Sequence, residues 1–129
     1  MLKRLDHIGV IVDDLEEAKT FAKGLGLALT RELTLPGRLK AAFFRCGDAE
    51  IEMVEVTEPN ERQRRLGTSK ARLEHIALEV EGLSDVVSQL NRLGVTMTSS
   101  AAFQLGNVSS YWTEPDSSDG VMYQLMERS

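Results

Sequence analysis

The sequence predicts an α+β fold made of two βαβββ modules, and an internal repeat is the main observation behind this prediction. The octapeptide LDHIGVIV near the N-terminus recurs as LEHIALEV in the second half. The repeat stays in register, because His7 to Gly26 and His75 to Gly94 both span 19 residues. A chain of 129 residues with 42% hydrophobic content can also build one real core. Self-similarity of this kind defines the architecture before any local assignment.

The first module is expected to begin with a strand over residues 5–12. Along it, Ile8, Val10 and Val12 alternate with the face that carries His7. A helix follows, which Asp13 or Asp14 can cap and Gly26 can end. Its apolar positions at helical spacing are Leu15, Ala18, Phe21, Ala22 and Leu25. Three shorter strands are predicted at about residues 28–33, 41–46 and 50–56.

The second module repeats this order, starting with a strand over residues 73–80. Ser84 is a possible helix cap, and Gly94 is the predicted end of the helix. Its apolar stripe is Val87, Leu90 and Leu93. Three strands are then expected at about residues 95–98, 108–113 and 121–127. Each module therefore has the order βαβββ.

The modules divide a single domain of residues 1–129. Module 1 covers about residues 1–57 and module 2 about residues 72–129. The stretch between them, residues 58–71, is polar apart from Leu66 and is predicted to be a surface linker with a helical turn.

Composition narrows the possible partners. A net charge of −5 and a pI near 5.1 argue against a nucleic-acid partner, because such proteins carry excess Lys and Arg. No segment approaches the roughly 20 apolar residues of a membrane span, so no membrane partner is expected. Cys46 is the only cysteine, which favours a reducing compartment, and we expect a cytoplasmic protein. The expected partner is a small-molecule substrate.

Four residues at equivalent places in the repeat could bind a metal. His7 and His75 lie on the first strand of each module, on the face opposite the alternating apolar residues. Glu52 and Gln124 hold the matching position on the last strands. Two imidazoles, one carboxylate and one amide oxygen suit one divalent ion such as Zn, Co, Ni, Mn or Fe. Taken singly, each residue is as well explained by a hydrogen-bonded core position or a solvated surface; the shared register favours ligands.

Four motifs carry a resemblance to a known family: LDHIGV at residues 5–10, EIEMVE at 50–55, LEHIALEV at 73–80 and GVMYQL at 120–125. They resemble the ligand-bearing strands of the vicinal oxygen chelate superfamily, which includes the glyoxalases, bleomycin-resistance proteins and dioxygenases. The similarity is closest to methylmalonyl-CoA epimerase and next to glyoxalase I. It implies an open, curved eight-stranded sheet, or cup, with helices outside, around a metal that chelates adjacent substrate oxygens. It also implies a homodimer.

The resemblance implies an isomerase, epimerase or lyase that acts through an enediolate on a small carbonyl or acyl-thioester substrate. Two positions depart from the epimerase pattern. Gln124 stands where epimerases usually have a glutamate, and Pro36 or Gly37 stands where a second glutamate is common. An amide cannot accept a proton near neutral pH, so Glu52 is the candidate catalytic base.

Alternatives remain open at this point. They are a glyoxalase I-like lactoylglutathione lyase, an Fe(II) dioxygenase and a non-catalytic binder of a small molecule such as an antibiotic. Gln124 argues against the dioxygenase, and retention of the other three ligands argues against the binder. The candidate substrate-binding residues are Arg38, Lys40 and Trp112.

Overall fold

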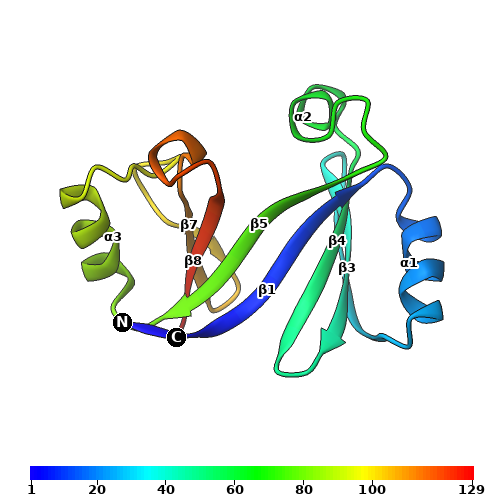
Figure 1. The fold of residues 1–129 in the computed structure, drawn as a ribbon, viewed down its shortest axis with the longest axis horizontal. Coiled ribbons are helices and arrows are strands. Elements are labelled where there is room, and N and C mark those ends of the chain that lie inside the picture. The colour runs from blue at the N-terminus through cyan, green and yellow to red at the C-terminus, as the bar shows by residue number, and fades with distance from the viewer. The chain divides into compact units, whose positions relative to one another are not determined.

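The computed structural model describes residues 1–129 and contains eight strands and three α-helices (Figure 1). The first half has β1 (Leu2–Val12), α1 (Leu15–Gly24), β2 (Ala28–Leu35), β3 (Leu39–Cys46) and β4 (Ala49–Val56), followed by α2 (Pro59–Arg65). The second half has β5 (Ala71–Val80), α3 (Leu83–Arg92), β6 (Phe103–Leu105), β7 (Val108–Trp112), a 3-10 turn (Pro115–Ser117) and β8 (Met122–Arg128). The predicted α+β class with two βαβββ modules is confirmed.

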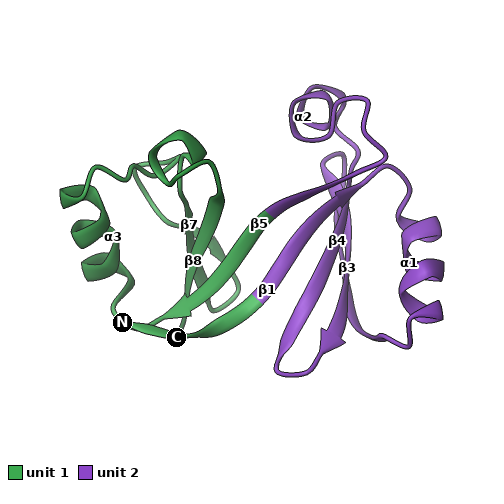
Figure 2. Cartoon of the chain, in the orientation of Figure 1, with its two compact units in different colours: residues 1–6, 75–129 green, residues 7–74 purple.

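Hydrogen bonds order the strands as β2-β3-β4-β1-β5-β8-β7-β6. The chain forms two compact units (Figure 2). Unit 2 is the continuous stretch of residues 7–74, and unit 1 combines residues 1–6 with residues 75–129. Both β1 and β5 therefore contribute to each unit, whereas every other strand belongs to one unit alone.

In unit 2, apolar side chains pack on both faces of the sheet. The cluster beneath α1 consists of Val12, Leu15, Ala22, Ala42, Phe44 and Met53. The cluster on the opposite face consists of Ile11, Ala41, Phe43, Val54, Val56 and Leu66. Alternation along β3 explains the division, because successive strand residues point to opposite faces. Phe21 and Leu25, predicted to belong to the buried stripe of α1, are each 64% exposed, and that part of the prediction was wrong.

Unit 1 has a smaller core under α3. Its buried members are Val80, Leu83 and Leu125, with Leu78, Val86, Val87, Leu90, Met97 and Tyr111 packed around them. Here too the helix covers one face of the strands.

The two long helices begin in related ways. Asp14 caps α1 by accepting the backbone N–H of Glu17, and Glu55 on β4 accepts the N–H of Leu15 at 2.8 Å. Ser84 does not cap α3, contrary to the prediction. Gly82, whose φ of 70° suits glycine, is the N-cap of that helix. Glu127 on β8 accepts the N–H groups of Gly82 and Leu83, at 2.9 and 3.0 Å.

The strand predicted at residues 95–98 is not present as a full strand. Met97 forms an isolated bridge with Thr113, and Thr98 donates to the Trp112 carbonyl at 2.8 Å. The second strand of this module is instead β6, at Phe103–Leu105. Thr96 accepts the N–H of Glu114 at 2.8 Å and donates its own N–H to Ser117 Oγ at 2.9 Å. The backbone of this run is therefore satisfied by separate contacts with β7 and the turn that follows it, rather than by a continuous ladder.

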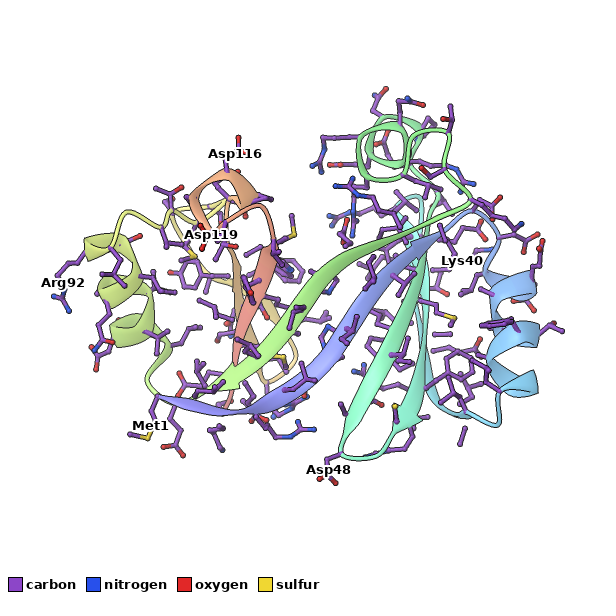
Figure 3. The ribbon with its side chains drawn as sticks, viewed as in Figure 1. Met1, Lys40, Asp48, Arg92, Asp116 and Asp119 are labelled. Carbon is purple, nitrogen blue, oxygen red and sulfur yellow. The ribbon has the colours of Figure 1, made fainter.

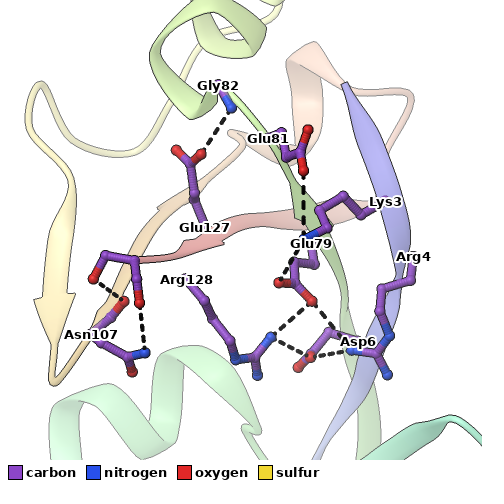
Figure 4. Close-up of polar contacts among 10 residues, drawn as sticks. Lys3, Arg4, Asp6, Glu79, Glu81, Gly82, Asn107, Glu127 and Arg128 are labelled. Atoms are coloured by element: carbon purple, nitrogen blue, oxygen red, sulfur yellow. Dashed lines mark hydrogen bonds and ion pairs between the residues drawn. The ribbon is translucent and has the colours of Figure 1, made fainter.

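A buried charge network ties the two ends of the chain together in unit 1 (Figure 4). Asp6 is 3% exposed and pairs with Arg4 and Arg128 at 2.9 and 3.0 Å. Glu79 pairs with the same two arginines, at 3.4 and 3.0 Å. Because each buried carboxylate has two guanidinium partners, its desolvation is compensated.

The segment between the modules contains the seven-residue helix α2. Arg62 on this helix donates to the backbone carbonyls of Val56 and Asp13, and Arg65 binds Glu74 through two hydrogen bonds of 2.8 Å. No helix combines the length and the apolar content that crossing a membrane requires.

Candidate metal centre

In unit 2, His7 and Glu52 lie next to each other on neighbouring parallel strands. Gly9 of β1 is opposite Glu52 of β4, so the glutamate projects from the same face as His7. His7 Nε2 lies 3.3 Å from Glu52 Oε1, and the His7 residue is only 5% exposed. An imidazole and a carboxylate therefore meet on a shielded face, which we call the His7 face.

An aromatic and a cationic side chain adjoin this pair. Phe43 of β3 is opposite Glu52 and contacts His7 edge to face, with ring centres 6.1 Å apart and planes at 81°. The guanidinium of Arg31, on β2, lies over the Phe43 ring, with Cζ 3.6 Å from the ring centroid. Arg31, Phe43 and His7 thus form a continuous row of contacts.

In unit 1, His75 and Gln124 have the equivalent relation. Ala77 of β5 is opposite Gln124 of β8, so Gln124 again pairs with the residue two positions after the histidine. His75 is 6% exposed and Gln124 is 9% exposed. We call this surface the His75 face.

A hydrogen bond orients the Gln124 amide. Its Nε2 donates to Ser110 Oγ at 3.0 Å, and Ser110 is 3% exposed. Because Ser110 binds the amino group, the amide oxygen of Gln124 is the atom that can coordinate a metal.

Two aromatic residues accompany this pair. Trp112 of β7 is opposite Gln124 and therefore shares its face. Phe103 of β6 packs against Trp112, with ring centres 5.9 Å apart. Trp112 thus lies beside a predicted ligand, as a substrate-binding residue would, although its role in binding stays a prediction.

Each unit has donors of the types that bind divalent metals. His7 and Glu52 supply an imidazole and a carboxylate in unit 2, whereas His75 and the oriented Gln124 oxygen supply an imidazole and an amide oxygen in unit 1. Imidazole nitrogen together with oxygen suits a borderline divalent ion better than Ca²⁺ or Mg²⁺, which prefer oxygen alone.

Arg38 and Lys40 lie apart from the row on the His7 face. Arg38 is exposed in the turn before β3, where its carbonyl accepts the N–H groups of Thr57 and Glu58. Lys40 (Figure 3) alternates with Ala41 and so shares the α1-covered face with Ala42, where its Nζ lies 3.8 Å from Glu55. Their roles in substrate binding stay predictions that this placement does not favour.

Arg31 was not predicted from the sequence, and a β-bulge explains why. Leu29 is opposite Phe44, but Arg31 is opposite Phe43, so β2 contains one extra residue at this point. Simple alternation from Leu29 would place Thr30 on the face that Phe43 occupies. The bulge places Arg31 there instead, and a single sequence gives no clear signal for it.

The order of strands and the paired donor positions define a class of protein. The model of the Glyoxalase/Bleomycin resistance protein/Dioxygenase superfamily matches residues 6–113. The chain therefore belongs to this superfamily, as the sequence motifs predicted. A sequence relative is the uncharacterised protein YqjC of Bacillus subtilis, 28% identical over 130 residues, covering 98% of this chain and 93% of that protein.

Solved structures share the fold. The hypothetical protein BH1468 from Bacillus halodurans has a TM-score of 0.83 at 24% identity, covering 98% of this chain and 94% of that one. Methylmalonyl-CoA epimerase from Mycobacterium tuberculosis has a TM-score of 0.87 at 21% identity, covering 99% and 89%. A Streptomyces coelicolor methylmalonyl-CoA epimerase variant in complex with 2-nitronate-propionyl-CoA has a TM-score of 0.83 at 17% identity, covering 100% and 99%.

Proposed function

We propose that this chain is a divalent-metal-dependent isomerase, epimerase or lyase that acts through an enediolate on a small carbonyl or acyl-thioester substrate. His7, Glu52, His75 and Gln124 are the proposed ligands of one ion. The observation that carries the proposal is the equivalence of the two pairs. In each unit the second donor is opposite the residue two positions after the histidine. Two unrelated buried histidines would not be expected to share this relation.

The proposed chemistry is removal of a proton next to a carbonyl group. A divalent ion bound there supplies a Lewis acid that stabilises an enediolate. Glu52 is the proposed base, because it is the one carboxylate among the four donors and its Oε1 lies 3.3 Å from His7 Nε2. Gln124 has no basic atom for this task, and its amino group is held by Ser110. The superfamily supports the reaction class, and the similarity to epimerase structures makes methylmalonyl-CoA the first substrate to test.

Elemental analysis of protein purified without added metal tests the first half of the proposal. We expect about one divalent ion per chain, removable by a chelator and restored by Zn, Co, Ni, Mn or Fe. A chain that takes up none of these ions would be a non-catalytic binder instead.

Solvent-deuterium exchange tests the second half. The substrates are methylmalonyl-CoA and the hemithioacetal of methylglyoxal and glutathione, which separate an epimerase from a lactoylglutathione lyase. We expect Glu52→Gln to lower exchange at the α carbon by at least about 100-fold. Gln124→Glu, which adds a second carboxylate, is expected to preserve or raise exchange.

Glu55→Gln is the matched control. It makes the same carboxylate-to-amide change on β4, but on the face covered by α1, where Glu55 accepts from the Leu15 N–H. Its exchange rate should equal that of the parent. If Glu52→Gln binds metal and exchanges at the parent rate, Glu52 is only a ligand and the base lies elsewhere.

We also propose a homodimer, which the superfamily resemblance supports. The sheet ends in strands β2 and β6, and their outer edges have no partner in the chain. Light scattering at micromolar concentration should therefore give twice the chain mass of 14.3 kDa. A value equal to the chain mass would reject the dimer.

A further inference from the structure

We propose that Arg31 binds an anionic group of the substrate, a carboxylate or a phosphate, beside the ligands of the His7 face. The inference rests on the proposed function, because it assumes that the substrate is held at His7 and Glu52. It adds that the substrate has a negative charge separate from the oxygens next to the reacting carbon.

The position of Arg31 supports this role. Its Cζ is 3.6 Å from the Phe43 ring centre, which is 6.1 Å from the His7 ring centre. The guanidinium is therefore within about 10 Å of the imidazole, and all three side chains belong to unit 2. A small molecule can span this distance.

The orientation of Arg31 also supports it. A guanidinium stacked on an aromatic ring keeps its N–H groups in its own plane, where they can bind a carboxylate or phosphate through two parallel hydrogen bonds. The Arg31 side chain is 51% exposed, and its ion pair with Glu50 has a 3.7 Å separation. That separation is longer than a hydrogen bond. Phe43 thus orients the N–H groups of Arg31, and Glu50 accepts no hydrogen bond from them.

Glu50 has another partner. Thr30 Oγ1 donates to Glu50 Oε2 at 2.5 Å and also lies 3.0 Å from the Phe43 carbonyl. This hydroxyl fixes the carboxylate, whose other oxygen lies 3.7 Å from Arg31 Nη2. The Arg31 side chain stays half exposed beside it.

Other arginines of unit 2 differ in this respect. Arg62 donates to two backbone carbonyls, and Arg65 makes two hydrogen bonds to Glu74, which raise the pKa of the Arg65 guanidinium. Those side chains stabilise the fold. Arg31 combines exposure, a fixed plane and a place on the His7 face.

Binding of two hydroxamates to the Co(II)-loaded protein tests the inference by calorimetry. Butyrohydroxamate is a metal chelator with a neutral tail, and succinate monohydroxamate has a similar tail that ends in a carboxylate. We expect the wild-type chain to bind the carboxylated probe about 10-fold to 100-fold more tightly, as a charge-assisted pair would give. Arg31→Ala should remove this preference while leaving butyrohydroxamate affinity within about two-fold.

Two further variants sharpen the result. Arg31→Lys keeps the charge but loses the planar fork, so an intermediate preference is expected. Arg45→Ala removes a positive charge from β3 at the position opposite Glu50, without touching the Arg31 stack. It should keep the full preference. An equal loss in Arg45→Ala and Arg31→Ala would show only a general charge effect and would overturn the proposal.

The outcomes separate the two levels of inference. If the wild-type chain binds butyrohydroxamate but shows no preference for the carboxylated probe, Arg31 is not an anion site and the metal centre stands. If it binds neither probe, the proposed metal function fails and the Arg31 proposal fails with it. Inorganic phosphate added as a competitor distinguishes the two anions: displacement of only the carboxylated probe would show that the site accepts phosphate.

Discussion

The His7 face of unit 2 and the His75 face of unit 1 have the same framework but different chemistry. Both present a histidine, a polar donor on the last strand and an aromatic residue opposite that donor. The donor is a carboxylate in unit 2 and an amide in unit 1. Phe43 is covered by the Arg31 guanidinium, whereas Trp112 is covered by the Phe103 ring.

The comparison indicates which strands of the repeated module differ between the two units. The histidine and the strand register are the same in both units, because they depend on β1 with β4 and β5 with β8. The covering side chain comes from β2 in one unit and from β6 in the other. β2 has eight residues and a bulge, and β6 has three residues. The outermost strands thus give one unit a cationic surface and the other an apolar surface.

The largest expected difference between the units concerns their aromatic residues. Phe43 is 4% exposed, so Phe43→Ala should lower the free energy of unfolding by about 3 to 5 kcal/mol. Trp112 is only partly buried, and Trp112→Ala should cost less than about 3 kcal/mol. Urea unfolding measures both values. Equal losses of unfolding free energy would mean that Phe43 and Trp112 contribute equally to stability, and would contradict this prediction.

A second comparison concerns the two histidines. If they bind one ion, His7→Ala and His75→Ala should each weaken Co(II) binding by about 100-fold or more, since even outer partners of ligands are worth 10-fold to 100-fold. Competition with a chelating dye measures the affinities. Should His75→Ala bind Co(II) as tightly as the parent, the ion would belong to unit 2 alone.

Much of this arrangement could be predicted from the sequence, because it depends on periodicity. The repeat located the modules, and strand parity placed His7 with Glu52 and His75 with Gln124. Arg31 could not be found, because a bulge reverses parity at one residue. The Ser84 cap and the strand at residues 95–98 were wrong, because contacts distant in sequence, from Glu127 and β7, satisfy those backbone groups instead.

A third prediction concerns the amide that replaces a carboxylate in unit 1. Ser110→Ala removes the acceptor of the Gln124 amino group, and a buried donor without a partner costs about 1 to 3 kcal/mol. The amide can then rotate, so Co(II) affinity should fall by about 10-fold. Ser109→Ala, whose hydroxyl bonds Gln104 near the surface, is the control and should alter neither value.

The smallest effect is expected from the carboxylates at the helix starts. Hydrogen bonds from the Leu83 and Gly82 N–H groups lower the pKa of Glu127 in the folded chain. Its contribution to stability is therefore present above the unfolded pKa and is lost as pH falls through the lowered folded value. Glu127→Gln should reduce the loss of melting temperature between neutral and acidic pH. A pH profile identical to that of the parent would contradict this role.

The division of β1 has a consequence for the order in which the protein is made. Unit 2 is one uninterrupted stretch, so all of its strands have left the ribosome once Glu74 has emerged. Unit 1 must join the first six residues to a segment that begins at His75, which is a long-range closure. We therefore expect the His7 face of unit 2 to form earlier during synthesis than the His75 face of unit 1.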